Sequence, residues 1–370
     1  ADVEQDNQGS NGGEHPADQL GEARTYQVAY AFYVGHDAGN EGATLGVVKK
    51  LDGQVDDVHL QSYDFPLNYP YRFRRLKAFK AKHLFSLKNA IVSSKSGLVI
   101  SPSRDKAFLQ SIGSLNRLLG WGNVLPEITS ASKVATHISG DVVICADTGY
   151  FHWLLEVMPN LIHCLNYLDK SVKIIIPSFP PSYQQNALCY LLGSEYEDRV
   201  FQIPLLAQVD RVFFTTCEDA SGYVRKADID VLRDAFDSEL DFPEKEYKIY
   251  ISRVKSAKRN IANEKDVEIA LQNLGFIPIY AEELSFLEQI KVYSTATQIV
   301  APHGAGLSNI VWCHEGTRVL EIFPHNNLHF CYASIALIKG LRYSYLECEY
   351  DSKSHGRVDL NKLLSELETS

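Results

Sequence analysis

The chain has 370 residues, of which 45% are hydrophobic and 22% charged, the balance of an ordinary globular protein. This excludes a disordered chain and a small disulfide-stapled module, and it predicts about two domains on a prior of roughly 150 residues each. The net charge of −10 at pH 7 argues against duplex-DNA binding by broad phosphate neutralisation, so we expect no nucleic-acid partner.

The first part of the chain predicts few regular elements. Residues 1–22 contain six acidic residues and no lysine or arginine, together with several Gly, Asn and Gln. We expect a disordered acidic tail there. Residues 26–103 have a mixed pattern, with short strand-like runs at 27–34 and 97–101.

A basic segment lies within this region, at residues 69–82. Six lysines and arginines occur there without an acidic residue, and aromatic side chains are interleaved with them. The plain interpretation is a solvated basic face, and the alternative is a contact with an acidic acceptor or a membrane surface. For that alternative, the candidate acceptor-binding residues are Arg72, Arg74 and Arg75.

From residue 141 onwards, short apolar runs alternate with segments of helical periodicity. The predicted strands are 141–146, 173–177 and 211–215, and the predicted helices are 151–168, 182–192 and 223–240. Such alternation is typical of parallel strands joined by helical crossovers. A charged segment with a proline at 241–246 follows, and we interpret it as a linker.

A second alternating series follows the linker. Its predicted strands are 248–253, 277–280, 298–302, 318–323 and 342–349, and its helices are 264–274, 286–293, 305–313 and 328–339. Ser285 and Glu288 have the spacing of a capping box, which supports a helix start there.

Two such series predict an α/β protein with two Rossmann-like, doubly wound domains that face a central cleft. We place an acceptor-binding domain at 23–243 and a nucleotide-binding domain at 244–370. The packing of the last helix back onto the first domain stays open.

The strongest local signal is a glycine-containing turn at residues 303–306. An apolar strand runs into His303, Gly304, Ala305 and Gly306 and then directly into a predicted helix. Glycine permits a tight turn and lets a ligand approach the N–H groups at the helix start, so this is a candidate anion site. The alternative is a packing turn without a ligand. It is not a Walker loop, and Asn309 stands where a dinucleotide fingerprint has its third glycine.

Arginines lie at the end of the first strand of the second series. Arg253 ends that strand and Arg259 follows in the next loop. Because strand carboxyl ends face the same crevice as the glycine turn, both guanidiniums can hold a diphosphate without a metal. The alternative is a pair of surface cations. Asp228 and Asp230 lie in helical periodicity, where positions i and i+2 diverge, so we expect no metal site and no cofactor.

Two candidate bases follow the strand at 141–146. Asp147 comes directly after the strand, and His152 lies in the first turn of the next helix. Both positions belong to the mouth of the predicted cleft. The alternative for His152 is a core histidine whose hydrogen bonds are made within the protein. Glu156, four residues later, either orients the imidazole or forms a pair on the helix surface. An unidentified residue of 1–140 is the third option.

Five ordered segments carry a family resemblance. They are 149–159, 250–253 with 259–264, 283–289, 303–309 and 319–323. Together they resemble the motifs of glycosyltransferase family 61, which includes plant β-1,2-xylosyltransferases, animal protein O-linked N-acetylglucosaminyltransferases and bacterial capsular-polysaccharide proteins. The resemblance covers about residues 141–330.

The resemblance implies a GT-B fold and inverting transfer from a nucleotide sugar, with uridine diphosphate (UDP) as the nucleotide, to a glycan acceptor. It also implies that donor binding involves Arg253, His303, Gly304, Ala305, Gly306, Leu307 and Glu321. Glu321 lies near the carboxyl end of its strand, where its carboxylate can accept hydrogen bonds from the ribose hydroxyls, and the alternative is a carboxylate satisfied by neighbouring helix N–H groups. The rival hypotheses are a catalytically silent sugar-binding or scaffold protein, and a nucleotide-sugar epimerase or phosphorylase.

Several features bear on location. No apolar run approaches the roughly 20 residues that span a bilayer, and no signal peptide is evident. The seven cysteines mostly lie in apolar segments and are interpreted as buried thiols, and no Asn-x-Ser/Thr sequon occurs. These features predict a cytoplasmic location, with peripheral contact at the inner membrane face left open. Together with the family resemblance, the lack of an anchor and of sequons implies the bacterial capsular branch, and so capsular or surface polysaccharide synthesis. A trimmed Golgi or ER lumenal domain is the second choice.

Overall fold

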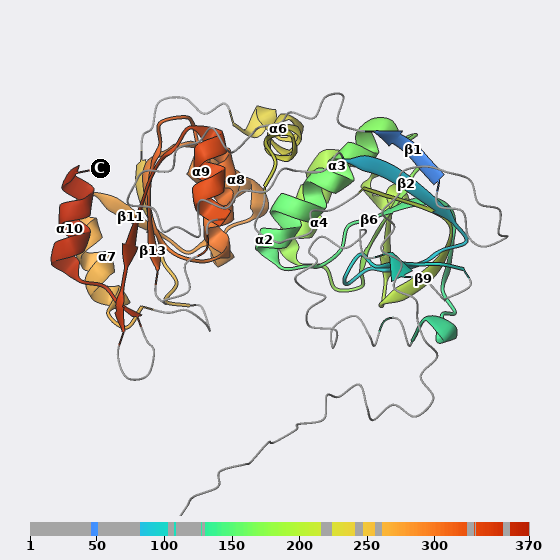
Figure 1. The fold of residues 1–370 in the computed structure, drawn as a ribbon, viewed down its shortest axis with the longest axis horizontal. Helices are drawn as coiled ribbons and strands as arrows, with labels where there is room; N and C mark the ends of the chain where they lie inside the picture. Colours follow the sequence, from blue (N-terminus) through green and yellow to red (C-terminus); the bar gives the residue numbers. More distant parts are fainter. Residues whose placement is uncertain are drawn as a thin grey trace, which may run out of the picture.

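The computed structural model describes residues 46–50, 82–102, 107–108, 127, 130–215, 224–240, 247–255, 261–323, 329, 331–350 and 356–369. The expectations for residues 1–22, for Arg72, Arg74 and Arg75, and for Arg259 concern residues outside this described part. The described residues form an α/β protein with two main sheets, one in each half of the chain (Figure 1).

The sheet of the first half is mixed rather than all parallel. Its strands follow the order β5-β4-β3-β9-β6-β7-β8, with β2 paired to β9 and β1 paired to β2. They are β1 (Gly46–Lys50), β2 (His83–Lys88), β3 (Ile91–Ser93), β4 (Val99–Ile100), β5 (Ala107–Phe108), β6 (His137–Ile144), β7 (Lys173–Pro177), β8 (Val200–Ile203) and β9 (Leu206–Thr215). β6 is parallel to β7 and β9, whereas β2 and β3 are antiparallel to β9.

The prediction of a purely doubly wound first domain is therefore wrong. The antiparallel strands come from residues 46–108. Among them, β4 lies in the strand-like run predicted at 97–101, whereas the other short runs show too little alternation to be recognised. In β3, for example, all three residues are buried, so no polar face marks it as a strand.

The helices of the first half are α2 (Tyr150–His152), α3 (Met158–Tyr167), α4 (Ser182–Leu192), α5 (Tyr196–Arg199) and α6 (Lys226–Ala235), with 3₁₀ turns η7 (Ala131–Lys133), η9 (Gly193–Glu195) and η10 (Asp237–Glu239). One turn of π-helix, η8 (Trp153–Val157), joins α2 to α3. Pro159 in the first turn of α3 has no N–H to donate to the preceding turn, which accounts for the wider turn before it.

The sheet of the second half is fully parallel, with the order β11-β10-β12-β13-β14. Its strands are β10 (Tyr247–Ile251), β11 (Phe276–Ile279), β12 (Ala296–Pro302), β13 (Arg318–Phe323) and β14 (Arg342–Glu347). This is the order of a doubly wound sheet. From β10, the chain adds β11 on one side and then β12, β13 and β14 on the other side, so the order of addition reverses between β10 and β12. At such a reversal, doubly wound sheets have their ligand-binding crevice at the carboxyl ends of the two strands.

The remaining elements of the second half are α7 (Glu264–Asn273), η11 (Ala281–Glu283), α8 (Phe286–Ser294), η12 (Ala305–Trp312), α9 (Cys331–Lys339), β15 (Glu349–Tyr350), β16 (Gly356–Arg357) and α10 (Leu360–Thr369). The capping box of Ser285 and Glu288 is present at the start of α8. The segment expected as an α-helix at 305–313 is a 3₁₀ helix, η12. Leu363 of α10 packs with the core of the second sheet, so this helix does not return to the first half (Figure 1).

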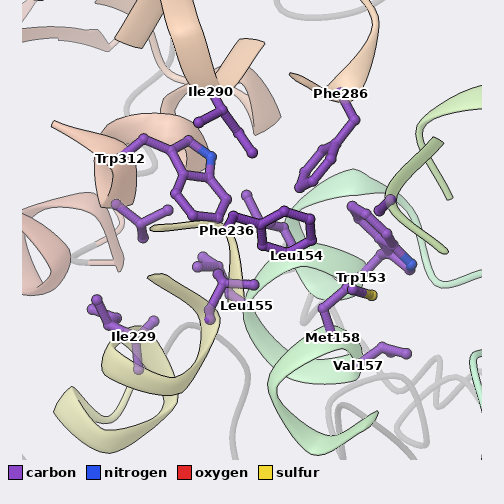
Figure 2. Packing of buried hydrophobic residues seen from close by; sticks show 14 of the residues in the cluster. Trp153, Leu154, Leu155, Val157, Met158, Ile229, Phe236, Phe286, Ile290 and Trp312 are labelled. Carbon is purple, nitrogen blue, oxygen red and sulfur yellow. The ribbon is translucent and has the colours of Figure 1, made fainter. Parts of the chain in front are cut away.

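One apolar core joins the two halves. Trp153 of the first half contacts Phe286 edge to face, with ring centroids 5.4 Å apart (Figure 2). Phe236, which follows α6, contacts both Phe286 and Trp312, at 5.1 and 5.8 Å. All four rings have no exposed surface. The two sheets are therefore held together by an aromatic contact that is inaccessible to solvent.

The six cysteines in the described part of the chain are free thiols, and only Cys189 is exposed. Among these same described residues, no helix combines the length and the apolar character needed to cross a membrane.

Candidate functional site

The crevice of the second sheet brings the predicted arginine to the glycine turn. β10 and β12 are neighbours, with Tyr250 paired to Val300. Arg253 lies two residues beyond β10, and His303 directly follows β12. Two segments that are 50 positions apart in the sequence therefore meet because parallel strands end at the same edge.

The guanidinium of Arg253 lies directly on Gly304. A Cβ atom placed on Gly304 would be only 2.0 Å from Nη1 of Arg253 and 2.9 Å from its Cζ. The φ angle of Gly304 is 173°, an extended conformation open to any residue. Glycine is required here by space and not by backbone conformation, since a side chain would displace the guanidinium.

Glu264 holds the backbone that presents Arg253. Its buried Oε1 accepts hydrogen bonds from the Arg253 amide, from the Ser252 hydroxyl at 3.1 Å and from the Tyr250 hydroxyl at 3.2 Å. Burial, with the Glu264 charge as the next cause, raises the pKa of Tyr250 well above its ordinary value, so Tyr250 stays a donor. Glu264 lies in one of the sequence motifs, but no role for it was predicted.

His303 is fixed by a carboxylate beneath the turn. Its Nδ1–H donates to Oε1 of Glu321, and the Tyr343 hydroxyl donates to the other oxygen. The imidazole is stacked on Phe323 and on His329, with centroids 5.2 and 5.3 Å away.

Glu321 has no exposed surface. Since both of its oxygens already accept hydrogen bonds, its carboxylate serves His303 and Tyr343 rather than the ribose hydroxyls expected from the sequence.

The second part of the glycine turn serves packing. A Cβ on Gly306 would be 3.2 Å from Cγ2 of Ile251, and the Tyr293 hydroxyl donates to the Gly306 carbonyl at 2.8 Å. Leu307 is buried in the core, and its amide already donates to the Gly304 carbonyl at 3.0 Å. Leu307 therefore does not face the crevice, whereas the role of Gly306 in donor binding stays a prediction. Ala305 and Gly306 are half-buried, and His303 and Gly304 are buried.

Asn309 ties this turn to the first half. Its Oδ1 accepts from the Tyr150 hydroxyl at 2.7 Å and from the Trp312 indole at 3.1 Å. Its Nδ2 donates to Gln289 at 2.8 Å. Three of the sequence segments that carry the family resemblance thus meet in one buried polar joint, which could not be predicted because its members are far apart in the chain.

The substitution Tyr150→Phe tests this joint. It removes one hydrogen bond between the halves but leaves Asn309 Oδ1 bonded to Trp312, so we expect a loss of about 0.5–1.5 kcal/mol in the free energy of unfolding. Urea denaturation measures it. Tyr190→Phe is the matched control, because the Tyr190 hydroxyl bonds to Ser238 at an exposed position. A loss for Tyr150→Phe no larger than for this control would contradict the role of the joint.

His152 reaches the glycine turn through a chain of ring contacts. Its imidazole contacts Phe151 edge to face at 5.2 Å, and Phe151 contacts Tyr332 at 5.8 Å. The Tyr332 hydroxyl donates to the Gly304 carbonyl at 2.6 Å. The His152 side chain is 25% exposed, and its Nδ1 lies 3.1 Å from Oε1 of Glu156, which orients the ring. His152 therefore comes from the half opposite Arg253, with one nitrogen oriented from within its own helix.

Asp147 lies three residues after β6 and is half-buried. Its amide donates to the Ser94 carbonyl at 3.2 Å, which attaches it to the loop between β3 and β4. Asp147 and His152 are thus in the same part of the first half, at the carboxyl edge of its sheet.

Residues 150–320 match the family model described as Glycosyltransferase 61. The chain is also similar to the Protein O-linked-mannose beta-1,4-N-acetylglucosaminyltransferase 2 of Xenopus tropicalis, at 30% identity over 106 residues, and of Homo sapiens, at 28% over 107 residues. These matches cover 27% of this chain and 18% of each relative. The homologue of Takifugu rubripes is 28% identical over 120 residues. The chain thus spans about a fifth of the length of these curated relatives.

Proposed function

We propose that the chain, whose residues 150–320 match the family model described as Glycosyltransferase 61, is an inverting, metal-independent glycosyltransferase of GT-B architecture. It moves a sugar from a nucleotide diphosphate sugar, with UDP as the nucleotide, to a glycan acceptor. The family accounts for glycosyl transfer, and the site geometry supports the finer parts of the proposal.

The observation that carries the proposal is the contact of Arg253 with Gly304 at the crevice between β10 and β12. A guanidinium offers a planar set of donors that matches two phosphate oxygens. The absence of a side chain on Gly304 lets the diphosphate approach the backbone next to it. The positive charge of Arg253 then stabilises the leaving diphosphate, which is the task that a metal ion performs in other transferases.

Inversion requires a base on the side of the sugar opposite the leaving group. We assign this role to His152, which comes from the half opposite Arg253, with Asp147 as the alternative. In this scheme His152 takes the proton of the acceptor hydroxyl while that oxygen bonds to the anomeric carbon and the diphosphate leaves with its electron pair. The hydrogen bond to Glu156 holds the imidazole in one orientation and stabilises it after proton uptake.

For the acceptor we propose a surface or capsular glycan, assembled at the cytoplasmic face of a membrane. The name of the relatives describes N-acetylglucosamine transfer to O-linked mannose. That name supports the same class of reaction for this chain.

Arg253→Ala tests the donor site. Loss of the charge-assisted hydrogen bonds is expected to weaken UDP binding by about 1.5–3 kcal/mol, or about 10- to 150-fold, in isothermal calorimetry. Lys255→Ala is the control, because Lys255 is exposed and bonds to Glu283. Both variants are expected to fold like the wild type. Equal UDP affinity of Arg253→Ala and wild type would overturn the donor site.

A turnover assay with a panel of nucleotide sugars tests the enzyme itself. We expect release of the nucleotide diphosphate from one UDP-sugar in the presence of a glycan acceptor, and the same rate after chelation of divalent metals. UDP binding without transfer to any acceptor would favour the sugar-binding or scaffold function instead.

A further inference from the structure

A second candidate site lies in the first half, in a cavity of about 40 Å³ between the sheet and α3. It is located at the carboxyl ends of β6 and β9, the same edge that carries Asp147 and leads to His152. None of the side chains that line it is charged. Its polar lining comes from Ser96, Asn160 and Thr215, and its apolar lining includes Val143, Leu161 and Phe213.

Thr215 is the observation that points to a ligand. It is only 2% exposed, and its Oγ1 is buried without a hydrogen-bond partner. Because residues i and i+2 of a strand share a face, Thr215 points to the same side of β9 as Phe213, which packs with α3. A buried hydroxyl left unpaired costs about 1–3 kcal/mol. A polar group of a ligand in the cavity would remove that cost.

The other two polar side chains of the cavity, Asn160 and Ser96, form hydrogen bonds with residues that do not line it. Lys82 Nζ donates to Oδ1 of Asn160 at 2.7 Å, and Ser96 Oγ donates to the buried carboxylate of Glu127 at 2.5 Å. Both bonds fix the orientation of side chains that line the cavity. Lys82 itself is bonded to Asp228 and does not line the cavity, so no cation is offered to an anionic ligand.

The size of the cavity limits what can enter. A single water needs about 10–15 Å³ by this measure, so 40 Å³ holds about three waters. A whole hexose ring is too large, whereas one of its substituents fits. An acetamido group has four heavy atoms, a methyl group suited to the apolar lining, and an amide that can pair with the Thr215 hydroxyl. A carboxylate lacks a cation here, and a hydroxymethyl group lacks the apolar part.

We propose that this cavity binds the acetamido group of an N-acetylated sugar at the end of the acceptor. The role as acceptor site rests on the proposed glycosyltransferase function, whereas the binding itself does not. The sugar ring then lies outside the cavity, towards Asp147, on the edge of the sheet from which the candidate base comes.

The test uses methyl N-acetyl-β-D-glucosaminide as the probe, with methyl β-D-glucoside and methyl β-D-glucuronide as matched comparisons. In saturation-transfer NMR, we expect the acetamido methyl protons to receive the strongest saturation. Titration should give at least tenfold weaker binding for the other two glycosides. Equal binding of all three, or no binding of the acetamido sugar, would overturn the proposal.

Thr215→Val removes the unpaired hydroxyl at nearly constant volume, so its thermal stability should equal or exceed that of the wild type. We expect about fivefold weaker binding of the probe. Thr136→Val is the control at the amino end of β6, away from the cavity. Wild-type affinity in Thr215→Val would contradict the site. UDP binding of the wild type is measured in parallel. If the wild type does not bind UDP, the proposed function is refuted. If it binds UDP but not the probe, only the proposed acetamido site is refuted.

Discussion

The substitution His152→Ala is expected to lower kcat by about 10²- to 10⁴-fold, the range for loss of a general base. UDP affinity should stay within about twofold of the wild type, because the base acts on the acceptor hydroxyl and not on the diphosphate. His152 comes from the first half, and its contact with the glycine turn is indirect, through Phe151 and Tyr332. Single-turnover kinetics with the identified donor measures the effect.

Free imidazole provides a readout that a structural role would not give. Added imidazole should restore part of the turnover of His152→Ala, because a quarter of the side chain is exposed and its removal leaves an accessible space. His137→Ala is the control, a half-exposed histidine paired with Asp210 at the far end of the first sheet. Near wild-type turnover of His152→Ala would return His152 to a packing role, and a comparable loss only in Asp147→Asn would assign the base to Asp147.

The largest effect on stability is expected for Asp228→Asn, at about 3–5 kcal/mol of unfolding free energy, because it removes a buried carboxylate from the buried Lys82 ammonium and from His163. Asp228 Oδ1 lies 2.5 Å from Lys82 Nζ and 3.0 Å from His163 Nε2. The Lys82 side chain is only 3% exposed. This cluster joins the start of β2 to α3 and α6.

The same cluster makes stability depend on pH. Burial by itself would raise the pKa of Asp228, but the charges and hydrogen bonds of Lys82 and His163 outweigh it and hold the pKa well below its usual value. A carboxylate with a depressed folded-state pKa stabilises the fold above its unfolded pKa of about 3.9, and this contribution is lost as the pH falls below that value. Between pH 6 and pH 3, the wild type should therefore lose more stability than Asp228→Asn does.

Urea denaturation across this pH range measures both effects. Asp230→Asn is the matched control, because Asp230 lies on the same helix but forms an exposed pair with Lys226 at 2.6 Å. Its expected loss is below about 1 kcal/mol. A similar loss for both variants would show that the buried cluster contributes no more than a surface pair. The different surroundings of Asp228 and Asp230 also agree with the argument that carboxylates two positions apart on a helix diverge.

The second half was predicted well from the sequence because its signals are local. Its strands are buried apolar runs between helices, and glycines 275 and 340, both with positive φ, end α7 and α9 as expected. In the first half, β7 and α4 also have the predicted bounds. In residues 46–108, β4 lies within the predicted run at 97–101, but β2 and β3 were missed, because their pairing with β9 joins segments more than a hundred positions apart.

The residues of the candidate site also fall into those that could be predicted from the sequence and those that could not. Arg253 and Gly304 could be predicted, because the carboxyl ends of neighbouring parallel strands must meet. The roles of Glu264, Tyr332 and Tyr343 could not, because each depends on a hydrogen bond to a partner outside its own element. The partner of Glu321 was mistaken for the same reason: its strand position was known, but Tyr343 on the adjacent strand was not recognised as its donor.

The aromatic core shared by the two sheets also determines which motions are open to the molecule. Swinging one half away from the other would separate Trp153 and Phe236 from Phe286 and Trp312 and expose rings that each bury about 150–250 Å². Such a hinge opening costs more free energy than a change of side-chain rotamer. Access of a ligand to the carboxyl ends of β10 and β12 is therefore expected to occur without separation of the two halves.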